Sequence, residues 1–465
     1  MAAWHQKQLQ NIKDEKLLKN KIMAFNSNYC SISKDSLQRD SHLRWSRREN
    51  EGAYRSAFSK DRDRVLYSKC FLRMRGKTQV FMLQENDYIR TRMTHSLEVN
   101  QIAKTIAKAL GLNLDLTEAI ALGHDAGHTP FGHIGERTLK ELIARETIIP
   151  DNEKGFKHNL QALRLFCALE KGADFPDIKG LNLTKYVLWG IAHHSSVGNI
   201  FSTNALGDVT TENPLYDAYL NAIKSYWSLE GLIVTIADEI AQRHHDIEDS
   251  LLYGVVNRQT IVEKLGKFAP LFSREDKKTY KTLKDGITTL SNPVFSSVFS
   301  RLVVNVYVVD TIKQTKDNLK RFGTSHGITN QADFARVKQS MLANQYKTLV
   351  SFSDTLNDID THFQDFLKTS VLSSYQVQAM DGKGAYIVRK IYEAFKATPS
   401  QLPDTALRSF MCFVTDTNDY NRVEAISLIS GNESKLYRCI ADYIGGMTDN
   451  YAYSEFNRLY GTKCY

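Results

Sequence analysis

The sequence is poor in helix-breaking residues and in paired cysteines. It holds only 8 prolines and 25 glycines among 465 residues, which favours long helices over many strands joined by turns. Its six cysteines are scattered and form no CxxC pair. That pattern disfavours a disulfide framework and a cysteine zinc site, and it indicates free thiols in a reducing compartment. We therefore expect an all-α protein with few or no strands.

Signals for membranes and export are also lacking. No apolar run approaches the roughly 20 residues that are needed to span a bilayer. The N-terminal stretch MAAWHQKQLQNIKDEK is polar and charged, whereas a signal peptide carries an apolar segment. These two absences predict a cytoplasmic protein without a membrane partner.

The chain is too long for one simple core and short for three independent domains, and its pattern indicates one mainly α core with a helical C-terminal extension. Residues 1–54 are polar and predict a loosely packed N-terminal arm, residues 55–255 predict a helical catalytic core, and residues 256–465 predict a helical C-terminal region. The stretch 294–309 is rich in β-branched residues, and its pattern fits either a strand or a buried helix. Residues 196–214 are the best candidate for an inserted loop.

Positive charge is in modest excess and is partly concentrated near the N-terminus. The net charge is +8, which suits a polyanionic partner such as a nucleotide or a nucleic acid. On charge alone, a phosphate-facing surface and a solvated helix face are equally good explanations of the cluster. Its members are Arg55, Lys60, Arg62, Arg64, Lys69, Arg73, Arg75 and Lys77, followed by Arg90 and Arg92.

Four side chains have the types and the order of a metal site. His124 and Asp125 are adjacent and precede Gly127, and at a helix end such neighbours can face one ion. His95 lies 29 residues earlier, and Asp238 interrupts the apolar stretch GLIVTIADEIA, where an unpaired carboxylate would be costly to bury. A single His-Asp pair is more often a capped or core histidine, but the ordered set of four predicts one bound divalent cation.

The motifs around this set resemble those of the HD-domain phosphohydrolases, and more closely the deoxyguanosine-triphosphate triphosphohydrolase branch. The resemblance runs in order from about residue 55 to 250 and resumes near 440–455. It is carried by the segments DRDRVLYSKCFLRMRGKTQVF, YIRTRMTHSLEV, GHDAGHTPFGHIGE, FKHNLQALRL, ADEIAQRHHDIED and DYIGGMTDNYA. It implies an all-α HD core and a homo-oligomer, often a hexamer or a tetramer.

The resemblance also implies a reaction. Water attacks the α-phosphorus of a deoxynucleoside triphosphate, and the products are the deoxynucleoside and inorganic tripolyphosphate. The two-His, two-Asp set suits Mn²⁺ or Mg²⁺, although its histidines also admit Fe, Co or Ni. The family makes dGTP the favoured substrate. A broad-specificity enzyme that a bound nucleotide activates is an open alternative, and single-stranded DNA is a further candidate effector.

Several other residues take roles from the same resemblance. His133 and Glu136 match the catalytic pair, and their spacing of three places them on one face of a helix that we expect to open at Pro130. An ordinary exposed pair is the alternative. The matching substrate contacts are Arg92 and, as an auxiliary, His128 for the phosphates, Gln79 and Val80 for the deoxyribose and base, Asp246 for the 3′-hydroxyl, and Tyr451 for the base.

Two of these roles have an ordinary structural alternative. Asp246 could instead form a surface ion pair with Arg243, and Tyr451 could be a core tyrosine.

The sequence also departs from the family twice. Gln242 stands where relatives usually carry tyrosine, and Glu239 stands where some carry a phosphate-binding lysine. These departures bear on which triphosphate is preferred.

The roles of other histidines stay open. His158, with Gln161 and Arg164, either lines the phosphate end or packs the core. The pairs His193-His194 and His244-His245 suggest a second metal site. We disfavour it, because adjacent side chains diverge on a helix and no carboxylate cluster joins them in the sequence.

Two other functions remain possible. The same metal site could serve a nucleotide phosphodiesterase or monophosphatase, although GKTQVF and Asp246 belong to the triphosphohydrolase pattern. A nucleic-acid-binding or regulatory protein with a vestigial site is disfavoured by the intact ligand set.

Overall fold

The computed structural model describes residues 44–46, 49, 54–81, 89–150, 154–171, 179–194, 202–203, 209–210, 214–341, 346–417 and 419–461. Most of the expected N-terminal arm and most of the expected loop at 196–214 lie outside these residues. Within them the protein is all-α, as predicted. The strands are a two-residue antiparallel pair, β1 (Ser202–Thr203) and β2 (Val209–Thr210).

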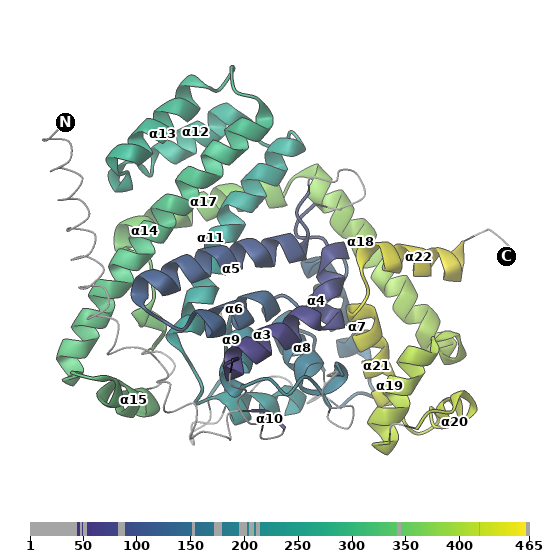
Figure 1. The fold of residues 1–465 in the computed structure, drawn as a ribbon. Helices are drawn as coiled ribbons and strands as arrows, with labels where there is room; N and C mark the ends of the chain where they lie inside the picture. The colour runs from purple at the N-terminus through teal and green to yellow at the C-terminus, as the bar shows by residue number, and fades with distance from the viewer. Residues whose placement is uncertain are drawn as a thin grey trace, which may run out of the picture.

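The helices follow one another in chain order (Figure 1). Up to residue 252 they are α3 (Ala57–Tyr67), α4 (Lys69–Arg73), α5 (Arg92–Leu110), α6 (Leu114–Gly123), α7 (His133–Arg145), α8 (His158–Arg164), α9 (Lys185–His193), α10 (Pro214–Ile223) and α11 (Leu229–Leu252). After residue 252 they are α12 (Arg258–Gly266), α13 (Arg274–Asp285), α14 (Asn292–His326), α15 (Gln331–Ser340), α17 (Asp354–Leu367), α18 (Tyr375–Ala397), α19 (Asp404–Thr415), α20 (Arg422–Ser427), α21 (Glu433–Gly445) and α22 (Asp449–Tyr460). Short 3-10 and π segments are η1 (Met74–Gly76), η3 (Leu165–Leu169), η5 (Ala269–Leu271), η6 (Lys347–Leu349), η7 (Lys368–Leu372) and η8 (Pro399–Gln401).

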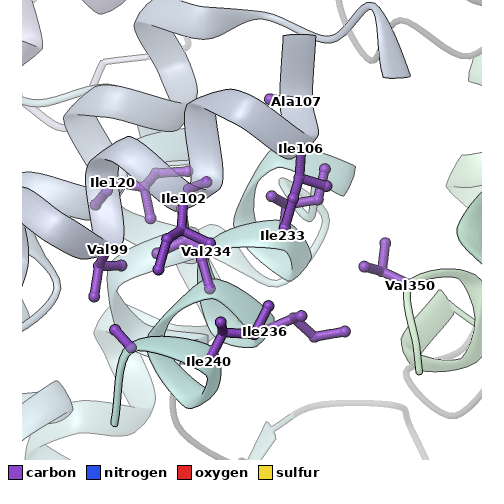
Figure 2. Packing of buried hydrophobic residues seen from close by; sticks show 14 of the residues in the cluster. Val99, Ile102, Ile106, Ala107, Ile120, Ile233, Val234, Ile236, Ile240 and Val350 are labelled. Atoms are coloured by element: carbon purple, nitrogen blue, oxygen red, sulfur yellow. The ribbon is translucent and has the colours of Figure 1, made fainter. Parts of the chain in front are cut away.

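The main core forms where α5 and α11 pack along each other, with α6, α9 and α14 around them. The apolar residues of α5 recur at helical spacing, so they share the face turned to α11. Figure 2 shows Ile102 and Ile106 of α5 among Ile233, Val234 and Ile240 of α11. All five side chains are buried. This packing holds the two helices that carry His95 and Asp238.

A second hydrophobic cluster joins α7 to helices α18, α19, α21 and α22, which lie together on one side of the molecule (Figure 1). Leu139 and Ile143 of α7 are buried in it. Although α7 falls inside the predicted catalytic core of residues 55–255, it packs with helices from the predicted C-terminal region. The C-terminal helices therefore support α7 directly, and α7 carries His133 and Glu136.

The ambiguous stretch 294–309 is helical and belongs to α14, which runs for 35 residues. Within the part of the chain that the structure describes, α14 is the one helix long and apolar enough to cross a membrane by length and composition. Core helices pass the same test. Buried side chains such as Phe299, Val303 and Tyr307 face the protein, and α14 packs against α5, α11 and α13.

Hydrogen bonds tie the C-terminal helices to the segments beside the predicted metal ligands. The ammonium of Lys77 is buried and donates to the main-chain oxygens of His128 and, at 2.9 Å, of Gly445. The carboxylate of Asp449 accepts from the main-chain N–H of Thr78 at 2.9 Å and of Phe131 at 2.9 Å. Two segments near the ligands are therefore fixed from the far end of the chain.

A buried ion pair joins α11 to α17 and gives a test of stability. Arg243 donates to Asp360 Oδ1 at 2.8 Å and Oδ2 at 3.0 Å, and the Tyr307 hydroxyl donates to Asp360 at 2.6 Å. Arg243 thus has a carboxylate partner other than Asp246. Asp360→Ala would leave a buried guanidinium without this partner, so we expect the free energy of unfolding to fall by about 3–5 kcal/mol in chemical denaturation.

The matched control is Asp365→Ala on the same helix. The Asp365 side chain is 66% exposed and lies 4.0 Å from Lys368, so its removal should change stability by no more than about 0.5 kcal/mol. Equal losses in the two variants would show that the Arg243–Asp360 pair does not hold α17 on α11.

Candidate metal centre and active site

Three segments bring the four predicted ligands together. Thr91 caps the N-terminus of α5 and places His95 in its first turn. Helix α6 ends at Gly123, so His124 and Asp125 lie in the turn that follows it. Asp238 comes from the middle of α11. All four side chains are buried, although imidazole and carboxylate groups are costly to bury without partners.

The separations between the ligand atoms suit a single ion. His95 Nε2 lies 2.9 Å from Asp238 Oδ1 and 3.8 Å from Asp125 Oδ2. His124 Nε2 lies 3.5 Å from Asp125 Oδ1 and 3.8 Å from Asp238 Oδ1. Two ligands that are each about 2.1 Å from a cation and at right angles to each other lie about 3 Å apart. Small adjustments would therefore place all four around one divalent cation.

His124 shows that this cluster needs a positive charge. Its Nδ1 lies 2.7 Å from the Ala121 main-chain oxygen, which can only accept a hydrogen bond, so Nδ1 carries a hydrogen. Its Nε2 is buried without a hydrogen-bond partner among the described residues. Burial alone would lower the pKa of His124, but Asp125 and Asp238 raise it to about 9. A divalent cation at Nε2 would meet the same demand for charge, so the residues fit a metal ion.

A chain of side chains fixes the orientation of His95. Its Nδ1 lies 3.1 Å from Nδ1 of His245, and His245 Nε2 contacts Glu98. If His245 donates from Nε2 to the carboxylate, its Nδ1 can accept from His95, which leaves His95 Nε2 free to bind metal. Nε2 of His244 lies 3.3 Å from the same carboxylate. A carboxylate therefore does join His244 and His245, contrary to the expectation from the sequence.

The hydrogen bonds from His95 through His245 to Glu98 predict that Glu98 controls metal affinity without touching the ion. Carboxylates that orient a ligating histidine typically contribute 10–100-fold to metal affinity, so Glu98→Gln should weaken Mn²⁺ binding by about 10-fold or more in calorimetric titration. The control is Glu141→Gln, because Glu141 is 56% exposed and lies 3.9 Å from both Arg145 and Arg389. Unchanged affinity in Glu98→Gln would mean that His95 needs no such support.

Arg92 provides unused donors beside the predicted metal ligands. It is 1% exposed and donates from Nη1 to Asp125 Oδ2 at 2.9 Å. Its Nε and Nη2 have no hydrogen-bond partner among the described residues. Gly132, at φ 62°, leaves space here, because an added Cβ would lie 3.2 Å from Arg92 Nη2. A buried guanidinium with two free donors is suited to an oxyanion.

The predicted catalytic pair lies in a cluster of four side chains. His128, His133, Glu136 and His158 have ligand atoms within 4.8 Å of one another. Glu136 Oε2 accepts from His158 Nδ1 at 2.6 Å, and Lys157 Nζ lies 3.2 Å from Oε1. The observed partner of the carboxylate is thus His158, whereas the sequence pattern paired it with His133.

The helix that carries His133 begins later than expected. It starts at His133 rather than near Pro130, because Gly132 takes a positive φ and the Thr129 hydroxyl donates to the Gly132 oxygen at 2.8 Å. His133 therefore stands at the first position of α7 and is exposed, while Glu136 is buried one turn later.

The remaining predicted substrate residues occupy other positions. Gln79 and Val80 are half-buried, and the Gln79 main-chain oxygen lies beside Gly132. Asp246 is half-buried two turns after Asp238, and burial, with the charge of Asp249, raises its pKa to about 7. Tyr451 is 46% exposed, and its hydroxyl lies 2.8 Å from that of Tyr443.

The two departures from the family pattern have defined contacts. The side-chain amide of Gln242 donates to Asp238 Oδ1 at 3.2 Å and Oδ2 at 3.3 Å. It therefore helps to orient a predicted metal ligand. Glu239 Oε2 lies 3.6 Å from Arg243 Nη2.

Sequence reasoning left the roles of three buried histidines unassigned. His158 contacts Glu136, His194 lies against His158, and His245 supports His95. The sequence held a signal for the role of His245, because Glu98 lies one helical turn after His95 and His245 lies two turns after Asp238. The main chain at His158 packs closely against Gly127 in the turn after α6, where an added Cβ would lie 1.9 Å from the His158 main-chain oxygen.

Known proteins resemble this chain over most of its length. Residues 92–243 match the HD domain family, and residues 350–458 match a phosphohydrolase-associated domain. Proteins from Roseobacter denitrificans, Cereibacter sphaeroides and Bartonella henselae are 34%, 34% and 33% identical over 89% of this chain, which covers 93%, 95% and 91% of them. Each is called a deoxyguanosinetriphosphate triphosphohydrolase-like protein.

Fold and site together define an HD-domain hydrolase whose buried histidines and carboxylates can bind a divalent metal ion. The chain belongs to the deoxyguanosinetriphosphate triphosphohydrolase-like family.

Proposed function

We propose that this protein hydrolyses a deoxynucleoside triphosphate, with dGTP favoured, to the deoxynucleoside and inorganic tripolyphosphate by attack of water at the α-phosphorus. The observation that carries the proposal is the placement of Arg92. Arg92 donates from Nη1 to Asp125 Oδ2, which lies 3.8 Å from His95 Nε2, and its Nε and Nη2 have no hydrogen-bond partner among the described residues. A polyphosphate has enough anionic oxygens to contact both the metal centre and a buried guanidinium.

The metal ion, Mn²⁺ or Mg²⁺ in our proposal, would supply a Lewis acid for the α-phosphate and lower the pKa of water when it is bound. His95, His124, Asp125 and Asp238 would hold it. Arg92 would bind a phosphate oxygen through its free donors, and His128, hydrogen-bonded to Asp125 at 3.1 Å, would line the same side.

Proton transfer is assigned to His133 and Glu136. The leaving 5′ oxygen needs a proton, and an exposed imidazole at the start of a helix can deliver one. Glu136 is fixed by His158 and Lys157, so its negative charge acts on His133 from a defined position. Burial would raise the pKa of Glu136, but His158 and Lys157 lower it overall, which keeps the carboxylate ionised.

The nucleoside end of the substrate is assigned to Gln79, Val80, Asp246 and Tyr451. Gln79 Oε1 is buried without a hydrogen-bond partner among the described residues, so it has an acceptor to offer. Val80 is partly buried and packs against the main core, and an apolar contact at the sugar favours deoxyribose over ribose. Asp246 would accept from the 3′-hydroxyl, and the exposed Tyr451 would cover the base.

The test is a panel of the four deoxynucleoside triphosphates with Mn²⁺, each alone and in pairs, with the phosphate products identified. Release of tripolyphosphate from dGTP alone supports the proposal. Activity only in mixtures would indicate a broad-specificity enzyme that a bound nucleotide activates. Release of orthophosphate or pyrophosphate alone would contradict the proposal and favour a phosphatase or phosphodiesterase.

We also propose a cytoplasmic homo-oligomer, a hexamer or a tetramer, with single-stranded DNA or a nucleotide as a candidate effector. A reducing compartment is supported by the described cysteines, because Cys70, Cys167, Cys412 and Cys439 are all free thiols. Light scattering would measure the number of subunits in the assembly. The salt dependence of the affinity for single-stranded DNA would show whether phosphate contacts provide the binding energy.

A further inference from the structure

A carboxylate and two imidazoles meet where α5 and α11 face each other, outside the predicted ligand set. Glu98 lies on α5 one turn after His95, and His244 and His245 are neighbours on α11. Ligand atoms of Glu98, His244 and His245 all lie within 4.8 Å of one another. Because His245 contacts both Glu98 and His95, anything that binds this cluster can affect a predicted ligand of the catalytic ion.

His244 turns a lone pair toward the carboxylate. Its Nδ1 lies 3.3 Å from the Ile240 main-chain oxygen, which can only accept a hydrogen bond, so Nδ1 carries a hydrogen. In the neutral ring Nε2 then has a lone pair, and it lies 3.3 Å from Glu98 Oε2. Two such atoms repel each other unless a positive charge lies between them. A bound cation or a second proton on the ring would supply that charge, and a metal count distinguishes the two.

The spacing of the ligand atoms suits a small tetrahedral ion. Two ligands that are each about 2.0–2.1 Å from zinc at the tetrahedral angle lie about 3.3–3.4 Å apart, which matches the separation of His244 Nε2 and Glu98 Oε2. His245 Nε2 contacts the same carboxylate and would move outward slightly to admit the ion. The two rings lie 4.2 Å apart, so these neighbours on a helix converge on one carboxylate.

Charge and access also favour a cation. Arg90 donates to Glu248, and its guanidinium lies 3.3 Å from Asp249 and 3.5 Å from Glu98. One guanidinium among three carboxylates leaves a net charge of −2, which a divalent cation would balance. The Glu98 side chain is 39% exposed, so an ion can reach the cluster from solvent. The four predicted ligands of the catalytic ion, in contrast, are buried.

We propose that Glu98, His244 and His245 form a regulatory site for Zn²⁺, and that an ion bound there weakens the binding of the catalytic ion at His95. The site is separate from the ligand set of four and from the proposed reaction. The antagonism rests on the proposed function, in which His95 is a metal ligand, whereas zinc binding by the cluster does not.

The antagonism follows from the positions of two ring hydrogens. Without zinc, His245 donates from Nε2 to Glu98 and accepts at Nδ1 from His95, so His95 Nε2 has a lone pair for the catalytic ion. With zinc on His245 Nε2, the neutral ring carries its hydrogen on Nδ1 and donates to His95 Nδ1. His95 then carries its own hydrogen on Nε2, directed at Asp238 Oδ1 2.9 Å away, and cannot bind metal there. Each ring holds one hydrogen in both states, so each ion lowers the affinity for the other without a net change in protons.

The first test counts the Zn²⁺ bound to the full chain. Wild type and His244→Phe are dialysed to equilibrium against Zn²⁺, and the metal per chain is measured by elemental analysis. Phenylalanine keeps the ring but removes both nitrogens, so we expect one ion fewer per chain in the variant. Equal counts would overturn the site, because they would mean that a second proton on His244 supplies the charge.

His326→Phe is the matched control. His326 Nδ1 also lies close to the main-chain oxygen four residues earlier, at 3.0 Å, but its ring is exposed and joins no group of three possible ligands among the described residues. This variant should bind as many ions as wild type. If His244→Phe does not fold by circular dichroism, Co²⁺ bound to wild type decides the question. Four-coordinate Co²⁺ absorbs visible light far more strongly than octahedral Co²⁺, so a weak spectrum would overturn the proposal.

The second test measures the antagonism. Protein loaded with Mn²⁺ and freed of unbound metal is titrated with Zn²⁺, and released Mn²⁺ is followed by electron paramagnetic resonance. Coupled sites typically change each other's affinity by about 5–150-fold, so half-release should need about 10-fold more Zn²⁺ in His244→Phe than in wild type. Equal midpoints would show that Zn²⁺ only replaces Mn²⁺ directly, which would overturn the antagonism. Zinc bound by the cluster in a protein that releases no tripolyphosphate would contradict the proposed function and leave the zinc site standing.

Discussion

Asp238→Asn should remove bound metal and lower kcat/KM by more than about 100-fold. Residues that only support a metal ligand contribute up to about 100-fold, so the loss of a ligand itself should exceed that value. The exchange keeps the size of the side chain and its place in α11, but it replaces a charged oxygen donor with an amide. His95 Nε2 lies 2.9 Å from Asp238 Oδ1, so the ligand set loses one member and its charge balance. Metal content and steady-state kinetics on the purified protein measure both effects.

The control for this variant is its neighbour on the helix. Glu239→Gln changes a carboxylate that pairs with Arg243 and is 41% exposed, so the metal content should stay at the wild-type value. An Asp238→Asn protein that binds Mn²⁺ as tightly as wild type would show that Asp238 is not a ligand.

Arg92→Lys should lower kcat/KM by about 100–1,000-fold, the effect of losing one donor that stabilises developing charge, with the metal content unchanged. Lysine keeps the positive charge near Asp125, but it lacks the planar fork of donors that Arg92 presents. The comparison of kcat with KM shows where the loss falls. A loss confined to KM would mean that Arg92 only binds the substrate.

Arg75→Lys provides the matched control, because Arg75 is exposed in η1 and belongs to the same basic segment of the sequence. It should have wild-type kinetics. Equal kinetics in Arg92→Lys and Arg75→Lys would contradict the assignment of Arg92 to the phosphates.

The helical fold is predictable, and the four residues of the predicted ligand set can be named in advance, because both inferences depend on local patterns. Apolar residues at helical spacing mark α5 and α11. The lone carboxylate of Asp238 in an apolar stretch indicates a buried partner, because burying such a group alone is costly. The stretch 294–309 is not predictable in this way, because a helix with apolar residues on most faces has no distinctive period.

The supporting residues are harder to predict because they depend on where helices end and meet. His193 and His194 are neighbours, and only the end of α9 decides that one stacks on Trp189 while the other turns to His158. The link between Glu136 and His158 spans two helices whose starting points the sequence does not mark clearly. Spacing within one helix could not reveal it, and the three-residue spacing to His133 pointed to the wrong hydrogen-bond partner.

The tie between Lys77 and Gly445 has a consequence for synthesis of the protein. The bonded residues are 368 positions apart, and Thr78 and Asp449 are 371 apart. Chains are made from the N-terminus and fold in that order. All four predicted ligands have been synthesised once Asp238 has left the ribosome, but the segments at Thr78 and Phe131 receive their last hydrogen bonds only when α21 and α22 have been made. A nascent chain would thus have its ligands in place before these segments are fixed, so catalysis should begin only near the release of the finished protein.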